Sequence, residues 1–252
     1  MRAFVLAAGL GTRLRPLTDF VPKPLVRVGD MPLVERAIRQ LVAAGIDEIG
    51  VNVFYRPEPI VAYIGDGSRF GAKVTWFDER DANAGEPLGT GGGLKNAESW
   101  LLGGGDAFML VNGDAWHTFE LASVASAHNP EDIATMVVHI DRRRPEIHTL
   151  ECREDGSMTG ITARPPATFD ELVMPNNGFR AIYSGVAVYS SRLLGILPNA
   201  KVSGLVTHGI QPALRNGERI AWNRAEGLWI DCGTVSELQR ADIFARSLPP
   251  IG

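Results

Sequence analysis

The chain has 252 residues, and 25 Lys and Arg against 29 Asp and Glu give a net charge of −4. Hydrophobic residues at 45% and charged residues at 21% are typical of a folded globular protein and exclude a disordered chain. The only basic run is Arg142–Arg144, so we expect no nucleic acid polymer as a partner. The two distant cysteines, Cys152 and Cys232, exclude a disulfide framework or a zinc knuckle. With neither a signal peptide nor a membrane span recognisable, the expected location is the cytoplasm, away from membranes.

Short apolar runs alternate with helical patterns through the first half, which predicts repeated β-then-α units. The expected strands are 3–7, 48–53, 73–77 and 107–111, and the expected helices are 33–44, 59–64 and 94–102. Strands joined by crossover helices run parallel, and ligands of such sheets bind beyond the carboxyl ends of the strands.

The second half turns to apolar runs at 133–140, 148–152 and 178–188, separated by turn signals such as Asp155-Gly156. Two helices follow, 205–215 and 235–246, and the Thr234 hydroxyl is placed to cap the second. We therefore expect an α/β, Rossmann-like fold: a mixed, mainly parallel sheet flanked by helices, with a small β subregion. One domain is expected over residues 1–246, with halves of about 1–130 and 131–246, and a loose end over 247–252.

A glycine-rich loop follows the first strand, and two cations lie close to it in sequence. Gly9 and Gly11 allow close backbone approach to a ligand, while Arg13 and Lys23 add fixed and mobile positive charge, which is typical of a triphosphate site. A dinucleotide fingerprint would need glycine where Leu14 stands, and the GKS or GKT of a Walker loop is missing. Taken alone, Gly-x-Gly would indicate only a turn between a strand and a helix.

The stretch LAAGLGTRLRPLT followed by PKP resembles the signature of the sugar-nucleotidyltransferase family, LAAG-x-G-x-R-(L/M)-x-P-x-T…PKP. The resemblance runs to about residue 245 and implies the nucleotide-diphospho-sugar transferase fold, with a nucleotide-binding first half and a sugar-binding second half. It implies an enzyme that joins a nucleoside triphosphate to a sugar 1-phosphate. By this resemblance Ala7, Ala8 and Gly9 contact the base and ribose, Gly11, Thr12 and Arg13 contact the phosphates, and Lys23 contacts the phosphate undergoing substitution.

Two aspartates end expected strands more than a hundred residues apart. Asp114 follows the strand at 107–111, and Asp231 precedes Gly233-Thr234. Such a pair can share one Mg²⁺, although a lone Asp at such a position more often caps a turn. The family resemblance assigns both as Mg²⁺ ligands and, with Arg13 and Lys23, places Asp114 in the catalytic set. Cys232 and Val235 depart from the family's usual D-V-G-T-P.

A second glycine-rich stretch, 86–93, is expected as a flexible loop leading into the helix at 94, and the resemblance makes Glu86 and Gly91 the base-reading residues. The Glu86 carboxylate could accept the two donors of guanine N1 and N2, which favours GTP. GEPL-x-TGGG together with VNGD-x-W is instead most similar to the N-acetylmuramic acid 1-phosphate uridylyltransferases of cell-wall recycling, which favours UTP. Relatives that make GDP-mannose or GDP-heptose share much of the loop, so both bases stay open.

The sugar is expected to meet polar groups of the second half. The candidates are Asn112, Asn177 and Gly185, although Ser184-Gly185 could equally form a β-bulge. Ala163-Arg164-Pro165 stands where the family has Glu-Lys-Pro, so Arg164 is the expected counterpart of the sugar-phosphate lysine.

Two other functions compete with this one. A nucleotide-sugar-binding regulatory subunit would be expected to lack one of Arg13, Lys23, Asp114 or Asp231, and all four are present. An NAD-dependent oxidoreductase is disfavoured by Leu14 and by the missing acid at the end of the second strand.

Overall fold

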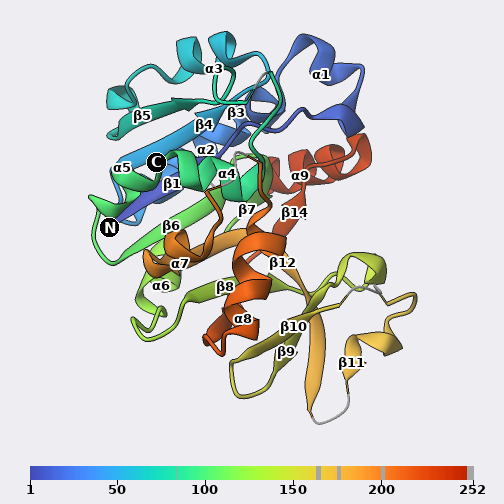
Figure 1. The fold of residues 1–252 in the computed structure, drawn as a ribbon. Helices are drawn as coiled ribbons and strands as arrows, with labels where there is room; N and C mark the ends of the chain where they lie inside the picture. The colour runs from blue at the N-terminus through green and yellow to red at the C-terminus, as the bar shows by residue number, and fades with distance from the viewer. Residues whose placement is uncertain (84, 163–165, 175–176, 200–201, 249–252) are drawn as a thin grey trace.

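The computed structural model describes residues 1–83, 85–162, 166–174, 177–199 and 202–248 (Figure 1). The strands are β1 (Arg2–Leu6), β2 (Arg27–Val28), β3 (Met31–Pro32), β4 (Glu48–Val53), β5 (Lys73–Asp78), β6 (Ala107–Asn112), β7 (Ala115–His117), β8 (Ala134–His139), β9 (Leu150–Arg153), β10 (Met158–Ile161), β11 (Val173–Met174), β12 (Gly178–Ser190), β13 (Ile220–Asn223) and β14 (Trp229–Asp231). The α-helices are α1 (Leu17–Phe20), α2 (Leu33–Ala43), α3 (Pro57–Ile64), α4 (Gly89–Asn96), α5 (Glu98–Leu102), α6 (Leu121–Ser126), α7 (Arg192–Ile196), α8 (Gln211–Arg215) and α9 (Val235–Ser247).

A mixed sheet of ten strands forms the centre of the described structure, with the main order β10-β9-β12-β6-β1-β4-β5. The pairs β1/β4, β1/β6 and β4/β5 are parallel, while β12 runs antiparallel to β6, β8 and β9. The mixed, mainly parallel sheet predicted from the sequence is therefore confirmed. Because β12 pairs with both β6 and β9, the sheet continues from the first half of the chain into the second.

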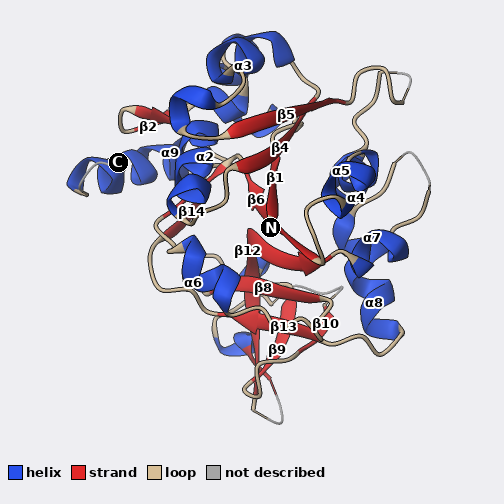
Figure 2. Cartoon of the chain, turned by 90° about the vertical axis from the view of Figure 1, so that its left-hand side faces the viewer, coloured by secondary structure: helices blue, strands red, loops and turns tan. Residues whose placement is uncertain are grey.

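Helices cover both faces of this sheet, as Figure 2 shows edge-on. Alternate residues of a strand point to opposite faces. Thus Ala3 and Val5 of β1 pack into a core with α2 and α3, while Phe4 packs into a second core with α4, α5 and α7. Strands buried on both faces read as continuous apolar runs, which is why β1 and β6 were visible in the sequence.

Helix α2 illustrates how local sequence sets the boundaries. Its buried residues, which include Val34, Ala37, Ile38 and Leu41, recur every three or four positions and so line one stripe. The chain then leaves the helix at Gly45, whose φ of 79° suits glycine.

Two sequence expectations need correction. The segment expected as a flexible loop before residue 94 is helical from Gly89, because the backbone N–H groups of Gly91 and Gly92 are held by the Ser203 carbonyl at 2.9 and 3.1 Å. The helix expected at 205–215 opens with a π-helical turn, Val206–Ile210, before α8. By contrast, Thr234 caps α9 as predicted, accepting a hydrogen bond from the Glu237 N–H.

The expected loose end at 247–252 falls mainly on 249–252, outside the described residues, whereas Ser247 still belongs to α9. Across the described ranges, no helix combines the length and the apolar character that crossing a membrane requires.

Candidate active site

The glycine loop leaves the carboxyl end of β1, and the Gly11 carbonyl ties it together by accepting from the Leu14 N–H and from a side-chain hydroxyl. Gly11 has a φ of 64°, and its carbonyl accepts a 2.8 Å hydrogen bond from the Thr18 hydroxyl. A Cβ on Gly11 would lie 3.0 Å from Thr18 Cγ2 and 3.2 Å from Lys23 Cβ, so only glycine fits there without displacement. A Cβ on Gly9 would meet nothing within 4 Å, so this residue lies on an open side of the loop.

The two cations of the loop each meet one of the two strand-end acids. Lys23 Nζ donates to Asp114 Oδ2 at 2.7 Å, and Arg13 Nη1 lies 3.7 Å from Asp231 Oδ2. The Lys23 side chain is only 6% exposed, whereas that of Arg13 is 66% exposed. Lys23 is therefore a fixed, nearly buried charge, and the exposed Arg13 is the one that can reach toward a ligand, which reverses the expectation that Arg13 supplies the fixed charge and Lys23 the mobile one.

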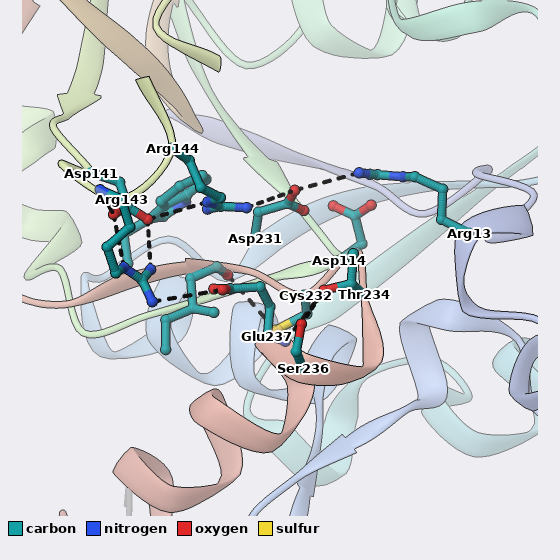
Figure 3. Close-up of polar contacts among 12 residues, drawn as sticks. Arg13, Asp114, Asp141, Arg143, Arg144, Asp231, Cys232, Thr234, Ser236 and Glu237 are labelled. Atoms are coloured by element: carbon teal, nitrogen blue, oxygen red, sulfur yellow. Dashed lines mark hydrogen bonds and ion pairs between the residues drawn. The ribbon is translucent and has the colours of Figure 1, made fainter. Parts of the chain in front are cut away.

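The two acids are neighbours because β14 pairs antiparallel with β7. Asp231 lies opposite Ala115 in this pair, and Asp114 directly precedes Ala115. Residues opposite one another in such a ladder have Cα atoms about 4.5–5.5 Å apart. Figure 3 shows both carboxylates in the same region, with Arg13 approaching from one side. The pairing of β14 with β7 thus brings these two distant aspartates to neighbouring positions.

Gly233, two positions after Asp231, is a glycine for a steric reason. A Cβ at Gly233 would lie 2.8 Å from the Arg13 guanidinium carbon, so the glycine leaves room for that side chain against the backbone. Cys232, although it departs from the family pattern, is fully buried, and burial raises the pKa of its thiol to about 12. It fills core space without contributing a charge at neutral pH.

Two adjoining clefts meet at Gly9, Leu10 and Asp114. One, of about 280 Å³, is lined by Leu6, Ala8, Gly9, Leu10, Asn52, Glu79, Pro87, Gly89, Thr90, Asn112 and Asp114. The other, of about 290 Å³, is lined by Gly9–Leu14, Lys23, Asp114 and Gly233. The second contains both loop cations, and the first is mostly uncharged, as expected for adjoining phosphate and base sites.

A buried network behind the first cleft was missed by the sequence analysis. Asn52 Oδ1 accepts the Ala7 N–H at 2.8 Å, and Asn52 Nδ2 donates to Glu79 Oε1 at 2.7 Å. Glu79 Oε2 accepts the Leu88 N–H at 3.0 Å, and burial raises the pKa of this carboxyl. The network ties both glycine-rich segments together. Their position in the sequence could have revealed them, because Asn52 and Glu79 lie at or just beyond the carboxyl ends of β4 and β5, where ligands of such sheets bind.

The predicted base-reading residues are placed differently from one another. Gly91 is buried, and its N–H is taken by Ser203, so its neighbours Gly89 and Thr90 line the cleft instead. Glu86 is exposed at the preceding turn, where its N–H donates to the Asn83 carbonyl.

The predicted sugar residues separate into three groups. Asn112 and Gly185 come together, since a Cβ on Gly185 would lie 2.5 Å from Asn112 Nδ2. Gly185 has a φ of 82° at a register shift of β12, so the bulge considered in the sequence analysis is present. Asn177 is not brought to this site: it lines a separate hollow with Arg153, Glu154 and Asp155. Arg164 lies outside the described residues.

The site offers two carboxylates as oxygen donors for a divalent cation. Among the residues that the structure describes, no group of three or more His, Cys, Asp or Glu side chains has an arrangement suited to a metal. Two carboxylates fit Mg²⁺, which takes few protein ligands and completes its shell with phosphate oxygens and water. Asp114 and Asp231 meet that requirement only in the presence of a phosphate ligand.

Comparison with known proteins shows which family the chain belongs to. Residues 2–247 match the family model described as Nucleotidyl transferase. The chain is 31% identical over 251 residues to an N-acetylmuramate alpha-1-phosphate uridylyltransferase of Neisseria meningitidis, covering 97% of this chain and 98% of that protein. It is 35% identical over 252 residues to a mannose-1-phosphate guanylyltransferase of Mycobacterium tuberculosis, covering 98% of this chain.

The chain spans only 66% of that mycobacterial protein. It spans 61% of a mannose-1-phosphate guanyltransferase of Neurospora crassa, to which it is 40% identical over 92% of this chain. Among solved structures, HddC from Yersinia pseudotuberculosis, complexed with GMP-PN, aligns with a TM-score of 0.77 at 20% identity over 97% of this chain and 99% of that one. This likeness supports the fold.

Proposed function

The chain belongs to the nucleotidyl transferase family and is a sugar-1-phosphate nucleotidyltransferase, and from that premise we propose that it transfers the uridylyl group of UTP to N-acetylmuramic acid 1-phosphate. The products are pyrophosphate and the UDP-sugar. The observation that carries the reaction class is the meeting of Arg13 and Lys23 with Asp114 and Asp231 beside the glycine loop.

The reaction needs charge compensation more than it needs a base. An oxygen of the sugar 1-phosphate attacks the α-phosphorus of the nucleotide, a P–O bond forms there, and the bond to pyrophosphate breaks with its electron pair leaving on pyrophosphate. Two unit negative charges 4 Å apart repel by about 4 kcal/mol at an effective dielectric constant of about 20. The nucleophile is already ionised at neutral pH, so catalysis consists of alignment and charge stabilisation.

The residues divide this work by their exposure. Lys23, nearly buried and held by Asp114, is a fixed charge for the phosphate undergoing substitution. The exposed Arg13 can swing onto the departing phosphates. We propose that Asp114 and Asp231 hold Mg²⁺, which when bound would neutralise phosphate charge and polarise the P–O bonds.

Support for the uridylyl donor and the muramic acid acceptor comes from the Neisseria protein, because the similarity covers 98% of its length. A guanylyltransferase acting on mannose 1-phosphate is the second candidate. The mycobacterial relative favours it, with higher identity over 98% of this chain, and so does the Glu86 carboxylate, which could accept two hydrogen bonds from guanine.

A pyrophosphate-release screen separates the candidates. UTP, GTP, dTTP and ATP are each tested with N-acetylmuramic acid 1-phosphate, mannose 1-phosphate, heptose 1-phosphate and glucose 1-phosphate in the presence of Mg²⁺. The proposal predicts the highest kcat/KM for UTP with N-acetylmuramic acid 1-phosphate. A preference for GTP with mannose 1-phosphate or heptose 1-phosphate would replace it with a guanylyltransferase, and no release with any pair would overturn the proposed activity.

A further inference from the structure

The basic run Arg142–Arg144 has no role in the function described so far. In the structure its three side chains make different contacts. Arg142 lies over the Phe169 ring, with 4.7 Å from the guanidinium carbon to the ring centroid. Arg143 donates to Asp141 and lies 3.7 Å from Glu237 of α9. Arg144 alone faces the strand-end acids, with Nη1 4.0 Å from Asp231 Oδ2.

A buried framework fixes the turn that carries Arg144. Arg144 Nε donates to Asp141 Oδ2 at 3.2 Å, and the Asp141 N–H donates to His148 Nε2 at 3.1 Å. His148 is fully buried, with Nδ1 3.0 Å from the Arg144 carbonyl, and burial lowers the pKa of its imidazole. A neutral ring with its proton on Nδ1 satisfies both contacts. The guanidinium is thus held from behind by its own loop.

The two terminal nitrogens of the same guanidinium are poorly satisfied. Its Nη2 is buried and has no hydrogen-bond partner among the described residues, and Nη1 is too far from Asp231 for a good hydrogen bond. Buried donors of charged groups normally have partners. The Arg144 side chain is still 21% exposed, so a phosphate oxygen that reached its terminal nitrogens would supply the missing charge-assisted hydrogen bond.

The position of Arg144 decides which phosphate it would take. Figure 3 shows Asp231 between two guanidinium groups, Arg13 on the side of the nucleotide loop and Arg144 on the side of the β8–β9 connection. In-line displacement requires the attacking oxygen and the leaving pyrophosphate on opposite sides of the α-phosphorus. Arg13 belongs to the nucleotide side, so Arg144 lies on the side from which the acceptor must come.

We propose that Arg144 binds the phosphate group of the incoming sugar 1-phosphate and so sets the affinity for the acceptor. The proposal rests on the proposed nucleotidyl transfer and adds an acceptor residue that the sequence analysis did not identify. Asp141 acts as its positioning residue, since it accepts from the Nε of Arg144 and from Arg143 at the same time.

The test compares Arg144→Ala with Arg142→Ala and Arg143→Ala in steady-state kinetics. We expect Arg144→Ala to raise the KM for the sugar 1-phosphate by about ten- to a hundredfold, the range for losing a charge-assisted hydrogen bond, with the KM for the nucleotide within about twofold. Arg142→Ala should leave both values unchanged. Arg143→Ala also loses a contact to Asp141, so it measures the effect of disturbing the turn alone and should shift the acceptor KM by less than about threefold.

A binding measurement without nucleotide or Mg²⁺ gives a second readout. Calorimetric titration compares N-acetylmuramic acid 1-phosphate with N-acetylglucosamine 1-phosphate. Both carry the phosphate, but only the first carries a lactyl carboxylate, so the pair separates a contact to the phosphate from one to the carboxylate. A loss of affinity for both ligands in Arg144→Ala, partly restored in Arg144→Lys, supports the proposal.

Three outcomes overturn the proposal: an unchanged acceptor KM, an equal effect in Arg143→Ala, or a loss confined to the carboxylate-bearing sugar. Each can occur while the wild-type protein still releases pyrophosphate. In that case the proposed function stands and only the role of Arg144 falls.

Discussion

The Lys23–Asp114 pair should respond unequally to removal of its two members. The Lys23 side chain is 6% exposed and that of Asp114 is 38% exposed. Asp114→Asn therefore leaves the nearly buried Lys23 ammonium without a counter-charge, whereas Lys23→Met leaves an unpaired carboxylate that is accessible to water. Breaking a fully buried pair costs about 3–5 kcal/mol, and discounting for the open carboxylate side gives about 2–3 kcal/mol for Asp114→Asn. For Lys23→Met, whose stem keeps its packing, we expect a loss below about 1 kcal/mol.

Urea unfolding at pH 7.5, followed by tryptophan fluorescence, measures both variants and the double variant, which should be less destabilised than the sum of the two. Both single variants should lose about a hundred- to a thousandfold in kcat, because each removes a charge next to the reacting phosphates. Equal destabilisation by the two substitutions, or a larger effect of Lys23→Met, would mean that the exposure of the two side chains does not set the cost of removing the partner.

Three further outcomes follow from the same structure. Gly11→Ala should lower stability by about 1–2 kcal/mol and raise the nucleotide KM, because its φ is positive and its Cβ would press on Thr18, and a thermal melt together with initial rates checks both effects. Glu79→Gln should cost about 1.5–3 kcal/mol in urea unfolding, since its new NH₂ must face the donor of either Asn52 or Leu88; an unchanged midpoint would argue against the network. Burial lowers the pKa of His117 to about 3, so the unfolded chain binds this proton below about pH 6.5 and the folded chain does not; stability is lost as pH falls from 6.5 toward 3. His117→Phe should flatten the slope of unfolding free energy between pH 6 and 4 by up to about 1.4 kcal/mol per pH unit, and an unchanged slope would mean that the ring charges in the folded state.

Periodicity and turn chemistry were enough to predict the main architecture. The apolar runs within β1 and β6, the stripe of α2 and the Thr234 cap of α9 are signals carried by residues close together in the sequence. The start of α4 was not predictable in this way. Its glycines have low helix propensity, and the helix is held by the Ser203 carbonyl, which is supplied from more than a hundred residues away.

The same distinction between local and distant contacts applies to the site. Arg13, Lys23, Asp114 and Asp231 could be predicted because each stands in a recognisable local pattern. The hydrogen-bond partners of backbone groups could not be predicted in this way. The Ala7 N–H, next to the cleft, donates to the Asn52 side chain, which lies 45 residues away in the sequence. Arg144 was noticed only as part of a basic run, because the sequence does not show which of the three neighbouring arginines lies next to Asp231 in the folded chain.

We propose that the glycine loop and the two aspartates act on one metal-bound triphosphate. A crystal structure with a non-hydrolysable UTP analogue and Mn²⁺ in place of Mg²⁺ tests it most directly, because anomalous scattering locates the ion. We expect a single ion contacted by both Asp114 and Asp231 and by the α-phosphate, with the triphosphate along residues 9–13. An ion bound by neither carboxylate, or a nucleotide lodged away from the loop, would contradict it.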